Sequence, residues 1–117
     1  MALFSHTDVP AVSPAEAFAM LEEGALLIDI REMDEWTAGH APSASHVPMG
    51  SLGAAASDMS KTTPMVFICR SGRRSHQAVA ALIEAGYHVF NLEGGMQAWQ
   101  QAGCVVVRND GSTGMVI

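Results

Sequence analysis

Cysteine, basic side chains and long apolar runs are all scarce in this sequence, and each scarcity excludes a class of protein. Only two cysteines are present, Cys69 and Cys104, so we do not expect a disulfide framework. Polar groups interrupt every window of about twenty residues, so no segment is predicted to span a membrane. Six basic side chains against twelve acidic ones give a formal net charge of −6. That charge argues against general binding to nucleic acid or to an anionic membrane surface.

The length of the chain, 117 residues, is enough for one domain and too short for two. Hydrophobic residues make up 49% of it and charged residues 15%, which is typical of a globular protein rather than a disordered one. The N-terminal residues MALFSH lack the positive region and long apolar stretch of a secretory signal, so the expected compartment is the cytoplasm. The histidines show no usual zinc spacing with the cysteines, and we expect neither a metal nor a cofactor.

Helices and strands are predicted to alternate along the chain. The pattern Ser13-Pro14-Ala15-Glu16 is typical of a capping box, and apolar runs bounded by turn residues indicate buried strands. The expected strands are 25–29, 45–48, 65–69 and 87–92, with 105–107 as a last extended piece or part of a tail. The expected helices are 14–23, a short one within 30–36, 51–57, 75–85 and one after Gly94-Gly95. This order predicts an α/β fold, a mainly parallel sheet flanked by helices on both faces.

Basic side chains gather beside one of the two cysteines. Three of the six, Arg70, Arg73 and Arg74, lie within the five residues that follow Cys69. In an acidic protein this clustering predicts an anion-binding site. Ligands of parallel sheets bind outside the carboxyl ends of the strands. Because Cys69 and Asp29 both lie at such ends, the two can share one site.

Three features of the loop after Cys69 favour an ionised thiol. A helix is predicted to follow the loop, and helix N-termini present free N–H groups and a partial positive charge. The arginines add full charges, and Gly72 permits a backbone conformation that points successive N–H groups inward. Such surroundings lower the pKa of a cysteine from about 8.5 to about 3.5–7.5. The alternative is that Cys69 is a small apolar residue of the core, and the arginines and glycine beside it argue against that.

The segment Cys69-Arg70-Ser71-Gly72-Arg73-Arg74-Ser75 resembles the active-site loop of the rhodanese-like (thiosulfate sulfurtransferase) family. Two further stretches are similar to other motifs of that family. The first comprises residues 27–32, Glu35-Trp36, Gly39-His40-Ala41-Pro42 and Val47-Pro48, and the second comprises Glu93-Gly94-Gly95-Met96, Ala98-Trp99 and Ala102-Gly103. The resemblance covers about residues 12–107. It implies one rhodanese-like domain with a five-stranded sheet and short terminal tails.

The resemblance also implies a two-step transfer of sulfur through Cys69. The thiolate attacks the outer sulfur of thiosulfate, sulfite leaves, and the resulting persulfide passes its sulfur to cyanide or a thiol. Arg70 and Arg73 are expected to attract the dianionic donor. The residues expected to bind the substrate are Arg70, Ser71, Gly72, Arg73, Arg74 and Ser75, with Asp29 and Arg31 in support. We also hypothesise that Arg74 turns inward and pairs with Asp29.

Other functions stay open at this stage. A cysteine phosphatase needs an arginine six positions after the cysteine, where this chain has Ser75, so loop length argues against phosphate chemistry. A sulfur carrier loaded by a protein partner, such as a desulfurase or a thioredoxin-like protein, is the main alternative to an enzyme. A catalytically silent domain is a third. Cys104 is either a resolving thiol for the persulfide or a bystander.

Overall fold

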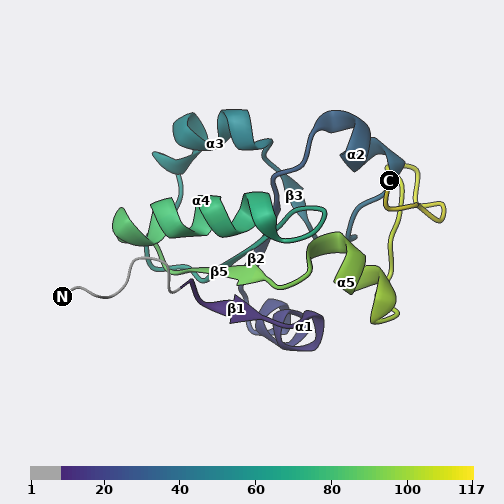
Figure 1. The fold of residues 1–117 in the computed structure, drawn as a ribbon, viewed down its shortest axis with the longest axis horizontal. Coiled ribbons are helices and arrows are strands. Elements are labelled where there is room, and N and C mark those ends of the chain that lie inside the picture. The colour runs from purple at the N-terminus through teal and green to yellow at the C-terminus, as the bar shows by residue number, and fades with distance from the viewer. Residues whose placement is uncertain (1–8) are drawn as a thin grey trace.

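Five short strands form one sheet in the computed structural model, which describes residues 9–117. Every pairing in this sheet is parallel, and the strand order is β1-β5-β4-β2-β3 (Figure 1). The predicted α/β fold with a parallel five-stranded sheet is therefore confirmed. The strands are β1 Ala11–Val12, β2 Leu26–Asp29, β3 Ser45–His46, β4 Met65–Ile68 and β5 Val89–Leu92.

Helices cover both faces of the sheet, because alternate strand residues point to opposite sides. Buried residues of α3 and α4 pack with Ile28 and Phe67, while those of α1 and α5 pack with Leu27 and Val66. Figure 1 accordingly shows α3 and α4 on one side of the sheet and α1 on the other. The helices are α1 Pro14–Glu22, α2 Met33–Ala38, α3 Met49–Ala56, α4 Arg73–Glu84 and α5 Gly95–Gln101.

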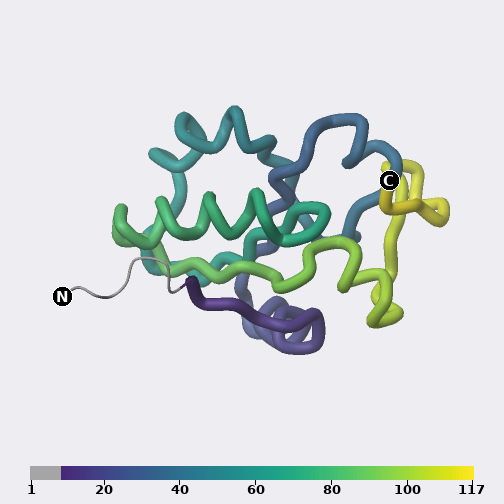
Figure 2. The backbone as a smooth tube through the Cα atoms, viewed as in Figure 1, coloured from purple at the N-terminus to yellow at the C-terminus, as the bar shows by residue number. Residues whose placement is uncertain are grey.

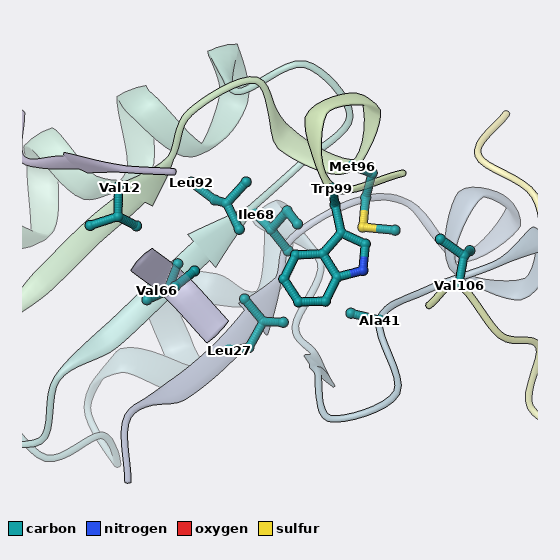
Figure 3. Packing of buried hydrophobic residues seen from close by; sticks show 10 residues of the cluster. Val12, Leu27, Ala41, Val66, Ile68, Leu92, Met96, Trp99 and Val106 are labelled. Carbon is teal, nitrogen blue, oxygen red and sulfur yellow. The ribbon is translucent and has the colours of Figure 1, made fainter. Parts of the chain in front are cut away.

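The core on the α1 and α5 side is built around Trp99, which is 3% exposed (Figure 3). Its ring lies among aliphatic side chains of three strands, and its Nε1 donates to the backbone oxygen of Val105 at 2.9 Å. This bond satisfies the polar end of a buried tryptophan. Phe67 is also fully buried, whereas Trp36 is half-buried and stacks against the rings of His40 and His46.

The fifth strand lies at the start of the described chain and not at its end. β1 pairs with β5 through Ala11 and Val12, and two residues are too few to give a hydrophobic period. The segment 105–107 adds no strand to the sheet. Instead, Val107 forms antiparallel bridges with His40 and Thr113.

The C-terminal segment lies beside α2 (Figure 2), where the amide of Met115 donates to the oxygen of Ala38 at 2.9 Å. No helix among residues 9–117 is long and apolar enough to cross a bilayer.

The boundary that matters most for the site is the start of α4, which begins at Arg73 and not at Ser75. Gly72 is the residue before the helix and has a φ of 97°, a left-handed conformation that favours glycine. This turn takes the chain from β4 into α4 within a few residues. The first turn of α4 therefore belongs to the loop around Cys69.

Candidate active site

The sulfur of Cys69 lies inside the turn between β4 and α4, and three groups of that turn face it. The backbone amide of Gly72 donates to Sγ at 3.1 Å and that of Ser75 at 3.4 Å. The hydroxyl oxygen of Ser75 lies 3.3 Å from Sγ. The turn thus forms the inward-pointing cup of N–H groups that the sequence predicts around Gly72.

These contacts shift the ionisation of the thiol. Burial raises the pKa of Cys69, but the hydrogen bonds of Ser75, Gly72 and Ser71 together outweigh it, so the pKa lies below its ordinary value. The side chain of Ser75 contributes most to the lowering, followed by backbone N–H groups. Of the influences that the sequence suggested, the backbone N–H groups of the turn favour the thiolate together with the Ser75 hydroxyl, and the arginine charges are not among the main causes.

Arg74 does not pair with Asp29, so that hypothesis is wrong. Its Nη1 and Nη2 donate to the two carboxylate oxygens of Glu35, at 2.9 Å each. Asp29 is already occupied by Arg31, whose Nη2 lies 2.8 Å from Oδ2 and also donates to the backbone oxygen of Gly39 at 2.7 Å. Arg31 follows Asp29 by two residues, and its Nε and Nη2 donate to both oxygens of the Asp29 carboxylate.

Asp29 and Arg31 therefore support the fold near the site without touching the sulfur. Both side chains are fully buried, and the amide of Arg31 also donates to Oδ1 of Asp29 at 3.0 Å. The pair fixes the turn between β2 and α2 and ties it to Gly39. α2 carries Glu35, so the buried pair positions the partner of Arg74.

Arg70 and Arg73 are exposed at the rim of the loop. Within residues 9–117 neither makes an ion pair, although Nε of Arg70 donates to the backbone oxygen of Ile117 at 2.8 Å. Arg73 lines a surface cavity of about 430 Å³ beside the loop, together with His76 and Glu93. Cys69 itself is only 1% exposed, which leaves little room for a large reactant at the sulfur.

A comparison with protein families identifies the family of this chain. The family described as the rhodanese-like domain matches residues 13–102, which is most of the chain. The protein belongs to the rhodanese-like domain family.

Relatives of this rhodanese-like domain include named sulfurtransferases. A sulfurtransferase of Allochromatium vinosum is 41% identical over 90 residues, covering 76% of this chain and 84% of the relative. YtwF of Bacillus subtilis is 42% identical over 79 residues, covering 68% of this chain and 77% of the relative. The crystal structure of a rhodanese-related protein from Thermoplasma volcanium superposes with a TM-score of 0.78 at 26% identity, covering 84% of this chain and 97% of that one.

The Gly94-Gly95 motif of this rhodanese-like domain brings the start of α5 against the backbone of the loop that begins at Cys69. The amide of Met96 donates to the oxygen of Cys69 at 2.7 Å, and that of Gln97 donates to the oxygen of Arg70 at 3.1 Å. A Cβ on Gly95 would lie 2.6 Å from the oxygen of Arg70. Only a glycine at this position lets the start of α5 approach the cysteine loop so closely.

Two residues of the site were not found from the sequence. Glu35 was placed in a family motif without a role, although its position three residues after Glu32 is a capping-box spacing. Asn91 was assigned only to a strand. It accepts a hydrogen bond from the hydroxyl of Ser75 at 2.5 Å and donates from Nδ2 to the oxygen of Gly72 at 3.2 Å. A polar residue inside the apolar run of β5 was the available signal.

Cys104 packs against the core on the α1 and α5 side, whereas Cys69 packs in the core on the opposite side. Both cysteines are free. Within the described part of the chain no cluster of three or more metal-ligating side chains occurs.

Proposed function

We propose that this protein is a sulfurtransferase in which Cys69 carries a sulfane sulfur as a persulfide. The donor is thiosulfate or a related small anion, and the acceptor is cyanide or a thiol. The observation that supports this most strongly is the convergence of two backbone amides and the Ser75 hydroxyl on one sulfur atom. Such preorganised donors stabilise a thiolate before the reaction and again when it is regenerated. The named relatives add support for sulfur transfer.

In the first step, the Cys69 thiolate attacks the outer sulfur of thiosulfate. A bond forms between Sγ and that sulfur, and the bond to the sulfonate sulfur breaks with its electron pair leaving on sulfite. Sγ becomes neutral, the outer sulfur keeps its negative charge in the new persulfide, and sulfite leaves as a dianion. Arg73 and Arg70 lie at the rim, where a cation attracts the dianion and offsets charge on the departing sulfite.

In the second step, the acceptor attacks the outer sulfur of the persulfide. The bond between the two sulfurs breaks, and its electron pair returns to Sγ. The N–H groups of Gly72 and Ser75 stabilise the resulting thiolate by hydrogen bonds. Thiocyanate forms when the acceptor is cyanide. The reaction requires a reduced Cys69, which suits the expected cytoplasmic compartment.

The size of the opening favours small donors over protein donors. Cys69 is 1% exposed, so a protein thiol reaches the sulfur only if the rim opens. A carrier that accepts sulfur from a desulfurase or a thioredoxin-like protein is therefore the second candidate. It would form the persulfide with its partner and turn over poorly with thiosulfate.

Phosphate chemistry is disfavoured by the placement of Arg74. A phosphatase loop needs an arginine that clamps two oxygens of the phosphoryl group. The guanidinium of Arg74 is engaged by both oxygens of Glu35, and the next residue is Ser75. Hydrolysis of an aryl phosphate ester tests this directly, and we expect none.

The loading of Cys69 tests the proposed function. The protein is incubated with thiosulfate, its intact mass is measured, and cyanide is then added. We expect the mass to rise by one sulfur atom and to return to its starting value with cyanide, in the wild type and in Cys104→Ser but not in Cys69→Ser. Loading without repeated turnover would favour the carrier, and an absence of loading would count against the proposed enzyme and favour the catalytically silent domain.

A further inference from the structure

Asn91 of β5 is 6% exposed, and both ends of its side-chain amide are used inside the loop. Nδ2 donates to the oxygen of Gly72 at 3.2 Å, and Oδ1 accepts from the hydroxyl of Ser75 at 2.5 Å. The first bond fixes the orientation of the amide, because a flipped amide would place its oxygen against the oxygen of Gly72. Oδ1 is therefore held toward Ser75.

The hydroxyl of Ser75 has two neighbours and only one proton. It lies 2.5 Å from Oδ1 of Asn91 and 3.3 Å from Sγ of Cys69. Oδ1 can only accept, so the bond to Asn91 uses the Ser75 proton. While that bond exists, Ser75 presents lone pairs to the sulfur, which suits a thiol that donates its S–H. A thiolate needs the proton instead.

We propose that Asn91 is a positioning residue that holds the hydroxyl proton of Ser75 while the sulfur is neutral and releases it when Cys69 becomes a thiolate. The amide thus competes with the sulfur for one proton. The movement required is a rotation of the hydroxyl about the Cβ–Oγ bond of Ser75, with no change in the backbone.

Its consequence for sulfur transfer rests on the proposed function. In the persulfide, Sγ is bonded to a second sulfur and carries no charge, so the Ser75 hydroxyl donates its hydrogen bond to Oδ1 of Asn91. When the acceptor attacks the outer sulfur, the electron pair of the S–S bond passes to Sγ. The hydroxyl then turns from Asn91 to the sulfur and stabilises the leaving thiolate.

Among residues 9–117, no charged side chain donates a hydrogen bond to the sulfur of Cys69, whose contacts are the Ser75 hydroxyl and the amides of Gly72 and Ser75. Arg74 at the start of α4 is paired with Glu35 of α2, and Arg31 is paired with Asp29 after β2. Outside the cup, Arg73, His76 and Glu93 line the neighbouring cavity, and Arg70 bonds to Ile117. α5 contributes the backbone amides of Met96 and Gln97 to the loop carbonyls.

A double-mutant cycle separates proton release from simple support of the loop. The thiol pKa of Cys69 is measured from thiolate absorbance in Asn91→Leu, Ser75→Ala and the double variant, all in a Cys104→Ser background. Loss of the hydrogen bond from Asn91 to Gly72 should change the Cys69 pKa equally whether Ser75 is present or replaced in Ser75→Ala. We expect Asn91→Leu to lower the Cys69 pKa when Ser75 is present. This shift should be about one unit more negative, a tenfold change in the ionisation constant, than the shift that Asn91→Leu causes in the Ser75→Ala background. Equal shifts in the two backgrounds would overturn the proposal.

A second test leaves both Asn91 and Ser75 unsubstituted. The side-chain amide resonances of Asn91 are followed by nuclear magnetic resonance across the pH range in which Cys69 ionises. We expect them to titrate with the thiol in Cys104→Ser and to stay constant in Cys69→Ser with Cys104→Ser. Constant resonances while Cys69 ionises would reject the proposal. Because neither test uses a sulfur donor, both give an answer even if thiosulfate fails to load the protein.

Discussion

Arg74 and Glu35 lie 39 positions apart in the sequence and are joined by two hydrogen bonds of 2.9 Å each. Oε1 of Glu35 also accepts from the amide of Glu32 at 3.0 Å. One carboxylate therefore fastens the first turn of α4, which contains Ser75, to the first turn of α2. This link therefore helps to hold the turn of α4 that carries Ser75 in place beside Cys69.

The Arg74–Glu35 pair predicts a loss of stability in acid. The hydrogen bonds from Arg74 hold the pKa of Glu35 below its ordinary value. A carboxylate with a lowered pKa stabilises the fold above its unfolded pKa, and this contribution is lost as the pH falls through the folded pKa. The pair is partly exposed, so we expect about 1 kcal/mol or less.

Urea unfolding of Glu35→Gln, at neutral pH and below the ordinary pKa of a glutamate, measures this effect. The variant should be less stable than the wild type at neutral pH and equally stable in acid. Glu22→Gln, an exposed residue at the end of α1, is the control and should match the wild type at both values. A difference between Glu35→Gln and wild type that persists unchanged in acid would contradict this explanation.

The buried pair Asp29 and Arg31 predicts a large penalty for removing one partner. Asp29→Asn leaves the Arg31 charge buried without its counter-ion, so we expect a loss of about 3 kcal/mol or more in the free energy of unfolding. Replacing both residues by apolar ones of similar volume, Asp29→Leu with Arg31→Met, should cost less than the single change. Denaturant unfolding compares them. A single variant as stable as the wild type would show that the pair is dispensable.

Gly95 predicts a link between the backbone of α5 and the reactivity of Cys69. Its φ is 59°, and a Cβ there would lie 2.6 Å from the oxygen of Arg70. Gly95→Ala should displace α5, weaken the bond from Met96 to Cys69, and reduce thiosulfate loading at least tenfold. Gly53→Ala, in α3 with no atom near its Cβ, is the matched control. It should load normally and gain about 0.5–1 kcal/mol of stability from the higher helix propensity of alanine. Equal loading in both variants would be evidence against this support.

Arg73 predicts a salt-dependent affinity for anionic donors. Because the side chain is exposed, its attraction for thiosulfate is screened by salt. Steady-state kinetics at low ionic strength should give a several-fold higher KM for thiosulfate in Arg73→Ala, with a smaller difference at high ionic strength. Arg108→Ala removes an equal charge away from the loop and should leave KM unchanged. Equal effects of the two variants would point to net charge alone.

The predictable parts of this fold are those encoded by local pattern. The apolar run Met65–Ile68 and the Ser13–Glu16 capping box specify their elements by themselves, and both were predicted correctly. β1 has only two residues, and it forms because it pairs with the edge of β5. This pairing cannot be predicted from a local pattern. The start of α4 was misplaced by two residues because the arginine-rich stretch was interpreted wholly as loop.

The candidate site shows the same division. Cys69, Gly72 and Ser75 are close in sequence, so their convergence follows from one tight turn. Charge partners depend on which elements meet in space. The sequence analysis named Asp29 as the partner of Arg74, and only the fold shows that Arg31 already pairs with this aspartate and that Glu35 lies beside Arg74.

The location of the transferred sulfur is the most direct test of the central claim. Thiosulfate radiolabelled in its outer sulfur is mixed with the protein, the persulfide is trapped by alkylation, and the chain is cut after lysine and arginine. This cleavage places Cys69 in the peptide 62–70 and Cys104 in the peptide 75–108. The account predicts label on peptide 62–70, and loss of this label as thiocyanate in a parallel sample that is treated with cyanide before alkylation. Label on peptide 75–108, or none on the protein, would contradict it.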